Sequence, residues 1–138
     1  MDHLTQPADA LASDLDRGRA SFADALRSGD AAGASALYAD DATLVAPAGE
    51  LLHGRSAIEG FWRTGLEIGI ADARFSVLEI ERRGDVAFEV GEYALVSIHE
   101  SGPGAVNRGR YLIVHRIEPD GHWRRAAEML SPDPGAGA

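Results

Sequence analysis

The hydrophobic pattern of this chain changes its period once, near residue 70, and this change limits the possible folds more than any other feature. Before it, apolar residues recur at helical spacing, as Leu11, Leu15, Phe22 and Leu26 do. After it, apolar residues alternate with polar ones or form short continuous runs, which is typical of strands. Helices followed by strands predict an α+β domain, with three helices packed on a strongly curved antiparallel sheet of about five or six strands.

Turn and cap residues divide the pattern into elements. Gly29 ends a first helix and Asp30 caps a second one, while Ser56 and Glu59 have the spacing of a capping box for a third. Short turns at Gly84-Asp85 and Pro119-Asp120-Gly121 separate later strands. The expected helices cover residues 7–28, 31–38 and 56–68, and the expected strands cover residues 43–46, 73–82, 86–99, 108–118 and 123–130.

The length and composition indicate one ordinary domain. The 138 residues suffice for a single buried core, which we place at residues 7–131, with flexible segments at 1–6 and 132–138. The absence of cysteine excludes disulfides and thiolate chemistry, and it fits a reducing cytoplasm. The N-terminal residues do not resemble a secretory signal, and no stretch has the length of a membrane span.

The charge balance argues against polyanionic partners. The chain has 13 basic and 22 acidic residues, so nucleic acid and anionic membrane are not expected to bind. All basic residues are arginine, which excludes Schiff-base catalysis and a phosphate-loop lysine. We expect no cofactor and propose no metal site, because the histidines do not converge with acidic residues in the pattern. Asp40 and Asp41 are interpreted as turn residues rather than as a catalytic pair.

Several stretches resemble the SnoaL-like families of the nuclear transport factor 2-like superfamily. The order of a helix end, an Asp-Asp-Ala-Thr strand, a Gly/Pro corner and a new helix is the main similarity, and the last two strands add to it. These stretches are residues 37–62, 111–114, 120–124 and 126–128. The resemblance implies a half-cone with an apolar cavity between helices and concave sheet. The superfamily includes isomerases, cyclases, dehydratases, transport factors and assembly domains, so the fold alone does not give the reaction.

Comparison with ketosteroid isomerase, a relative in that superfamily, excludes its mechanism here. The resemblance places the isomerase's base at Ala46, its oxyanion tyrosine at Phe22 and its oxyanion aspartate at about Ile113. None of these three side chains can move a proton. They are instead expected to line the cavity, together with Trp62, Glu92 and Tyr111, as ligand-binding residues.

Two polar residues on the inward face are the predicted catalytic groups. Glu128 lies among apolar neighbours, where burial would raise its pKa and suit it for acid/base work. His115 shares a strand face with Tyr111 and Ile113 and is the expected partner of Glu128. The orientation of Glu92 stays open, because a bulge at Gly91 would turn it to solvent and place Tyr93 inside.

Three functions remain open from the sequence. The first is an acid/base isomerase, cyclase or dehydratase acting on a small apolar metabolite. The second is a non-catalytic domain that binds such a ligand, and the third is a dimeric assembly domain. A homodimer is expected through the convex face of the sheet, where Arg110, Leu112, Val114 and Arg116 point.

Overall fold

The computed structural model describes residues 8–98 and 104–134 and shows an α+β half-cone. The expected flexible segment 1–6, the end of the expected strand at residue 99 and the tail from residue 135 lie outside the described residues. No helix in the described part of the chain is long and apolar enough to cross a membrane. The elements are α1 (Ala8–Arg27), α2 (Ala31–Ser35), β1 (Tyr38–Val45), β2 (Leu51–His53), α3 (Arg55–Glu67), β3 (Ile70–Arg83), β4 (Val86–Ser97), β5 (Val106–Ile117) and β6 (Trp123–Pro132).

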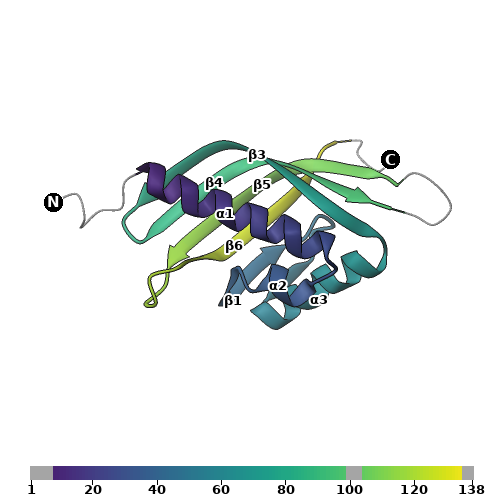
Figure 1. Cartoon of the computed structure of the whole chain (residues 1–138), viewed down its shortest axis with the longest axis horizontal. Helices are drawn as coiled ribbons and strands as arrows, with labels where there is room; N and C mark the ends of the chain where they lie inside the picture. The colour runs from purple at the N-terminus through teal and green to yellow at the C-terminus, as the bar shows by residue number, and fades with distance from the viewer. Residues whose placement is uncertain (1–7, 99–103, 135–138) are drawn as a thin grey trace.

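The six strands form one mixed sheet in the order β2-β1-β6-β5-β4-β3. After α3 the chain crosses to the far edge of the sheet and returns as an antiparallel meander from β3 to β6 (Figure 1). Strand β6 therefore arrives beside β1 in the same direction, and this pair is parallel. The expectation of a wholly antiparallel sheet is wrong for this one pair, because periodicity does not reveal which strand closes the edge.

The helices lie on the concave face of the sheet, as expected. Helix α1 runs diagonally across the strands, and α2 and α3 pack near β1 (Figure 1). The main core joins α1, α3 and the sheet through Phe22, Tyr38, Ile58 and Trp62, each at most 2% exposed. A smaller core cluster under the first half of α1 contains Leu11, Leu15 and Ala87.

Most predicted element boundaries agree with the structure within three residues, but several local predictions are wrong. No strand is expected at residues 51–53, where the structure has β2. The expected second helix includes Tyr38, whereas α2 ends at Ser35 and Tyr38 begins β1. Asp40 and Asp41 lie within β1 rather than in a turn. Their carboxylates pair with Arg55 and Arg116 at 2.8 Å each, so exposed ion pairs replace the expected turn bonds.

The start of α3 also differs from its prediction. The capping box is not formed, because α3 begins at Arg55 with Gly54 as its N-cap and no side-chain cap hydrogen bond. Gly54 has φ of 92°, and its amide donates to the Ala42 carbonyl at 2.8 Å, which fixes the entry of the helix one residue early. Glu59 pairs with Arg63 one turn further along.

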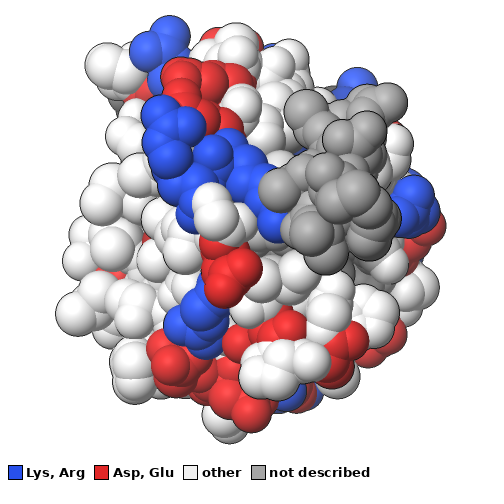
Figure 2. All heavy atoms as spheres, turned by 90° about the vertical axis from the view of Figure 1, so that its left-hand side faces the viewer, with Lys and Arg blue, Asp and Glu red and all other residues white. Residues whose placement is uncertain are grey.

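Acidic and basic side chains are interspersed on the end of the molecule that carries the β3–β4 and β5–β6 hairpins. Figure 2 shows this end, with basic side chains in blue next to acidic side chains in red. Exposed ion pairs such as Arg124–Asp120 at 2.9 Å account for part of this mixture. Such exposed pairs contribute little to stability, roughly 0–1 kcal/mol each.

Candidate functional site

A buried polar network at the centre of the cone holds Glu128. Its carboxylate accepts a hydrogen bond from the Tyr38 hydroxyl, which in turn accepts one from Trp62 Nε1 at 3.2 Å. Arg125 Nη1 lies 3.5 Å from Glu128 Oε2, and the Arg125 guanidinium stacks over the rings of Phe22 and Tyr38, 4.9 and 5.4 Å from their centroids. Glu128 is therefore enclosed by its own partners.

Burial and charge set the protonation of this network. Burial raises the pKa of Tyr38, and the negative charge of Glu128 raises it further, so the phenol stays protonated. Burial lowers the pKa of Arg125, but the neighbouring Glu128, Tyr38 and Glu89 outweigh this effect and leave the pKa raised. The network thus contains a fixed cation held among aromatic rings.

A second buried network is centred on Glu89, which is fully buried. Its carboxylate accepts hydrogen bonds from the Tyr111 hydroxyl, from Arg19 Nη1 at 2.8 Å and from His115 Nε2 at 2.9 Å. Burial raises the pKa of Glu89, but the hydrogen bonds from His115 and Tyr111 and the charge of Arg19 lower it more, to about 2. Glu89 is therefore ionised at neutral pH.

The ionised Glu89 determines the form of His115. Burial lowers the pKa of His115, although the bond to Glu89 opposes the shift, and the imidazole is neutral at pH 7. Because an ionised carboxylate can only accept, His115 must carry its proton on Nε2. Its Nδ1 then has a free lone pair, which is the form of a general base.

The two predicted catalytic residues are both buried on the inner face but belong to different networks. Glu128 is bonded to Tyr38, and His115 is bonded to Glu89, so the expected Glu128–His115 partnership is not formed. In the sheet, His115 lies opposite Arg125 and Glu128 lies opposite Ile113, on the two sides of a register shift between Val114 and His115.

The orientation expected for Glu92 is wrong, and the alternative with Tyr93 inside is correct. Glu92 is exposed on the outer face, whereas Glu89, Gly91 and Tyr93 point inward. The glycine at position 91 was the feature of the sequence that could have indicated the inner face of β4. A Cβ at this glycine would lie 2.5 Å from the ring of Tyr111, so only glycine fits on the inner face there. Sequence reasoning missed Glu89 because it placed the other face of this strand inward.

Four of the predicted ligand-binding residues fill the cone instead of lining an opening. Phe22 contacts Trp62 edge-to-face at 5.0 Å, and Phe75 joins Phe22 and Tyr111 at 5.9 and 5.8 Å. Phe22, Trp62, Tyr111 and Ile113 are each at most 2% exposed, and none of them lines the two cavities described next. Their aromatic contacts occupy the space where a ligand was expected.

An apolar cavity of about 410 Å³ lies at the end of the cone next to Ala46, and we call it the Ala46 cavity. Its walls come from the β1–β2 turn, α3, the start of β3 and the adjoining ends of β4, β5 and β6. A few polar groups stand among mainly apolar walls. The lining residues are Ala46, Pro47, Ala48, Glu50, Phe61, Thr64, Gly65, Ile68, Ile70, Tyr93, Leu95, Asn107, Arg108 and Pro132.

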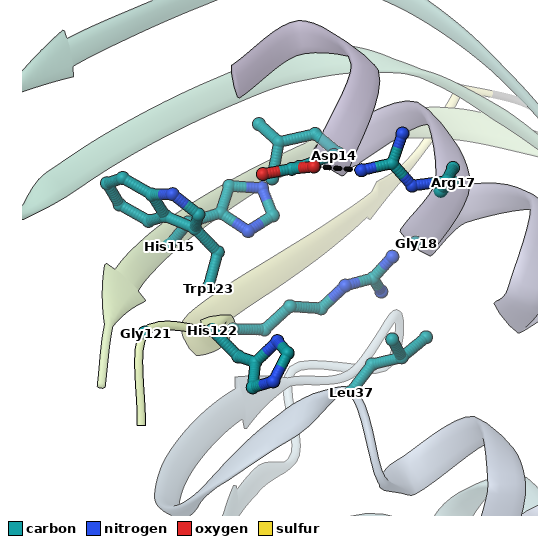
Figure 3. A pocket seen from close by; sticks show the side chains of 10 residues that line it. Asp14, Arg17, Gly18, Leu37, His115, Gly121, His122 and Trp123 are labelled. Atoms are coloured by element: carbon teal, nitrogen blue, oxygen red, sulfur yellow. Dashed lines mark hydrogen bonds and ion pairs between the residues drawn. The ribbon is translucent and has the colours of Figure 1, made fainter. Parts of the chain in front are cut away.

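A polar cavity of about 460 Å³ lies at the opposite end of β5 and β6, and we call it the His115 cavity. Figure 3 shows Asp14 and Arg17 on α1 facing His115, His122 and Trp123 on the strand side, with Leu37 below. The lining residues are Asp14, Leu15, Arg17, Gly18, Leu37, His115, Gly121, His122, Trp123 and Arg125. Within residues 8–98 and 104–134, no group of three or more acidic or histidine side chains is placed to hold a metal ion.

Solved structures with the same fold support this architecture at low sequence identity. A nuclear transport factor 2-like superfamily protein from Salmonella enterica superposes with a TM-score of 0.78 at 16% identity, covering 93% of this chain and 94% of that one. A ketosteroid isomerase-like protein from Erwinia carotovora gives 0.74 at 18% identity, covering 88% and 96%. The protein Aln2 from a Streptomyces species gives 0.79 at 17% identity, covering 92% and 94%.

Sequence comparison gives the family directly. No protein of curated function matches the chain significantly. The SnoaL-like domain family matches residues 19–126, which is most of the chain and includes parts of all three helices and all six strands. The chain therefore belongs to the SnoaL-like domain family.

Proposed function

We propose that this protein binds a small, mainly apolar metabolite in the Ala46 cavity. The observation that carries the proposal is the cavity itself, because about 410 Å³ is within the roughly 300–1,000 Å³ typical of small-molecule sites. Phe61, Ile70 and Leu95 offer apolar walls to the body of a ligand. Asn107 and Arg108 at the rim suit a polar or anionic group at one end of it.

The position of Glu128 favours binding over catalysis at this site. Glu128 does not line the Ala46 cavity, and its carboxylate is already engaged by Tyr38 and Arg125. A base that must first break a buried charged hydrogen bond is poorly placed to take a proton from a ligand. An isomerase, cyclase or dehydratase that uses Glu128 as its base is therefore less favoured than a ligand-binding domain.

A filled-cavity variant tests the binding proposal. Thr64 lines the cavity from the exposed side of α3, so Thr64→Trp can fill it without disturbing the core. Arg63→Trp, at the neighbouring position of the same helix, places the same ring outside this cavity and is the matched control. Titration with the fluorescent probe 1-anilinonaphthalene-8-sulfonate should show at least tenfold weaker binding for Thr64→Trp only. Equal affinity in both variants would contradict the proposal.

We also propose that the protein is a homodimer through the convex face of the sheet. Leu112 and Met129 are 41% and 47% exposed there. Val90 pairs with Leu112, and Leu112 pairs with Met129, so these apolar side chains form a row across neighbouring strands. A row of this kind in contact with water suits burial against a second copy.

A single charge tests the dimer proposal. Leu112→Arg places a cation at the centre of the apolar row, which would be unpaired in a dimer interface. Light scattering after gel filtration should give twice the chain mass for the wild type and one chain mass for Leu112→Arg. A wild type that is monomeric at all concentrations would refute the dimer while leaving the ligand-binding proposal untouched.

A further inference from the structure

The His115 cavity has a composition that the ligand-binding proposal does not use. It lies at the end of β5 and β6 away from the Ala46 cavity and shares no lining residue with it. Two of its lining side chains, His115 and Arg125, are both buried and polar, with 5% and 4% exposed. His115 is paired with Glu89 and Arg125 with Glu128, yet both side chains also line the cavity, so a molecule bound there would meet them.

We infer that this cavity is a second small-molecule site, in which His115 removes a proton from a bound neutral compound. The compound class is a planar molecule with a weakly acidic C–H next to an electron-withdrawing group. In this role His115 is the catalytic base and Glu89 is the residue that positions it.

The geometry around His115 supports this role. Its Nε2 is bonded to Glu89 at 2.9 Å, which fixes the ring and leaves Nδ1 as the nitrogen that can accept. Among the described residues, the side-chain atom that is both sealed from solvent and without a hydrogen-bond partner is Arg125 Nη1. In the described part of the chain Nδ1 of His115 has no hydrogen-bond partner, and it is not sealed from solvent as Arg125 Nη1 is, so it is open to the cavity that His115 lines.

Charged residues around His115 are also placed to stabilise the two charges that proton transfer would create, a positive imidazolium and a negative compound. When Nδ1 takes a proton, the imidazolium lies beside the Glu89 carboxylate, which is held in place by Tyr111 and Arg19. This is the arrangement by which a buried carboxylate stabilises a protonated histidine. The negative charge left on the compound lies in a cavity lined by Arg125 and by the Arg17–Asp14 ion pair, so Arg125 is the cation that faces it.

The remaining walls suit a flat molecule of modest size. Trp123 and Leu15 present apolar surface, and Gly18 leaves open space on the α1 side. The nearest heavy atom to a Cβ placed at Gly18 would be a methyl of Leu37 at 4.0 Å. The volume of about 460 Å³ holds a bicyclic compound.

The probe reaction that we choose is the ring opening of 5-nitrobenzisoxazole. Nδ1 of His115 takes the proton from the carbon at position 3, the C–H electron pair forms the nitrile, and the N–O bond breaks. The oxygen leaves as the phenolate of 2-cyano-4-nitrophenol, which absorbs visible light. The histidine then releases its proton to water, so neither an oxidant nor a cofactor is needed.

Two glycine variants separate this site from general effects on the fold. Gly18→Leu places a side chain in the cavity without touching His115, and Gly60→Leu makes the same change in α3, where a new Cβ meets open space. Both replace a helix-interior glycine, which favours the helix, so both are expected to fold. His115→Gln removes the base, and thermal unfolding shows whether that variant is folded.

The wild type should open the probe faster than an equal concentration of free imidazole. Gly18→Leu and His115→Gln should each lose at least tenfold in rate, while Gly60→Leu keeps the wild-type rate. A wild-type rate no higher than that of imidazole, or an unchanged rate in Gly18→Leu, would overturn the inference. Because the His115 and Ala46 cavities share no lining residue, failure of the probe reaction is distinguishable from failure of dye binding in the Ala46 cavity.

Discussion

Glu89 is the ionised carboxylate on which the hydrogen bonds of the second network converge. It accepts hydrogen bonds from three side chains on α1 and β5 while it is itself on β4, so it ties the first helix to the middle of the sheet. A carboxylate that is fully buried and ionised is rare unless such donors surround it. Loss of one donor therefore leaves an incompletely paired buried charge.

Acid should destabilise the protein through Glu89. Its pKa is about 2 in the folded chain, against 4.5 for the free side chain, so its stabilisation is complete above the unfolded value and is lost as pH falls toward 2. The shift corresponds to on the order of 3 kcal/mol. Urea unfolding at pH 5 and at pH 3 should show a clear fall for the wild type and a smaller fall for Glu89→Gln. Equal falls would contradict this account of Glu89.

The Tyr38 hydroxyl should contribute to stability through Glu128. Tyr38→Phe removes the donor to the buried carboxylate and the acceptor of Trp62 Nε1, with almost no change of shape. We expect a loss of roughly 1–3 kcal/mol in the free energy of unfolding. Tyr93→Phe, another buried tyrosine on the inner face, is the comparison. A Tyr38→Phe variant as stable as the wild type would show that this network is not a stabilising one.

At the scale of elements, the register of strand β4 determines that Glu89 is buried and Glu92 is exposed. Its inner face is set by Gly91, against which the ring of Tyr111 packs. Gly91→Ala should therefore cost about 1–3 kcal/mol by overpacking, whereas Gly60→Ala in α3 should stabilise the protein by roughly 0.5–1 kcal/mol. Chemical denaturation of both variants measures the contrast. Similar free energies of unfolding for the two would argue that Gly91 is not under steric constraint.

The helices and the long strands could be predicted from the sequence, because they depend on periodicity and on turn residues that act locally. The family could be predicted because the same local patterns resemble it. The inner face of β4 was not predictable from alternation alone, since Glu89 and Glu92 look equivalent until the contact between Gly91 and Tyr111 is known. Glu128 and His115 were correctly placed inside, but their partners lie 90 and 26 positions away along the chain. Such long-range pairings depend on strand order, which local patterns do not contain.

At the scale of the whole molecule, the cone is packed in the middle and open near its two ends. Aromatic side chains fill the centre, and the Ala46 and His115 cavities lie at opposite ends of β5 and β6. A cavity thus remains near Ala46, where we propose that a ligand binds, although the central space is filled by Phe22 and Trp62. Glu128, a residue of the central network, therefore lines neither of the two cavities.

The most direct test of the binding proposal is a titration of the ¹⁵N-labelled protein with 1-anilinonaphthalene-8-sulfonate, followed by amide chemical shifts. The proposal predicts saturable shifts that concentrate at Ala46, Thr64, Ile70 and Leu95, which line the Ala46 cavity. The same titration of Thr64→Trp should lose them. Shifts confined to the convex face around Leu112, or none at all, would contradict the proposal that this protein binds small molecules in its cone.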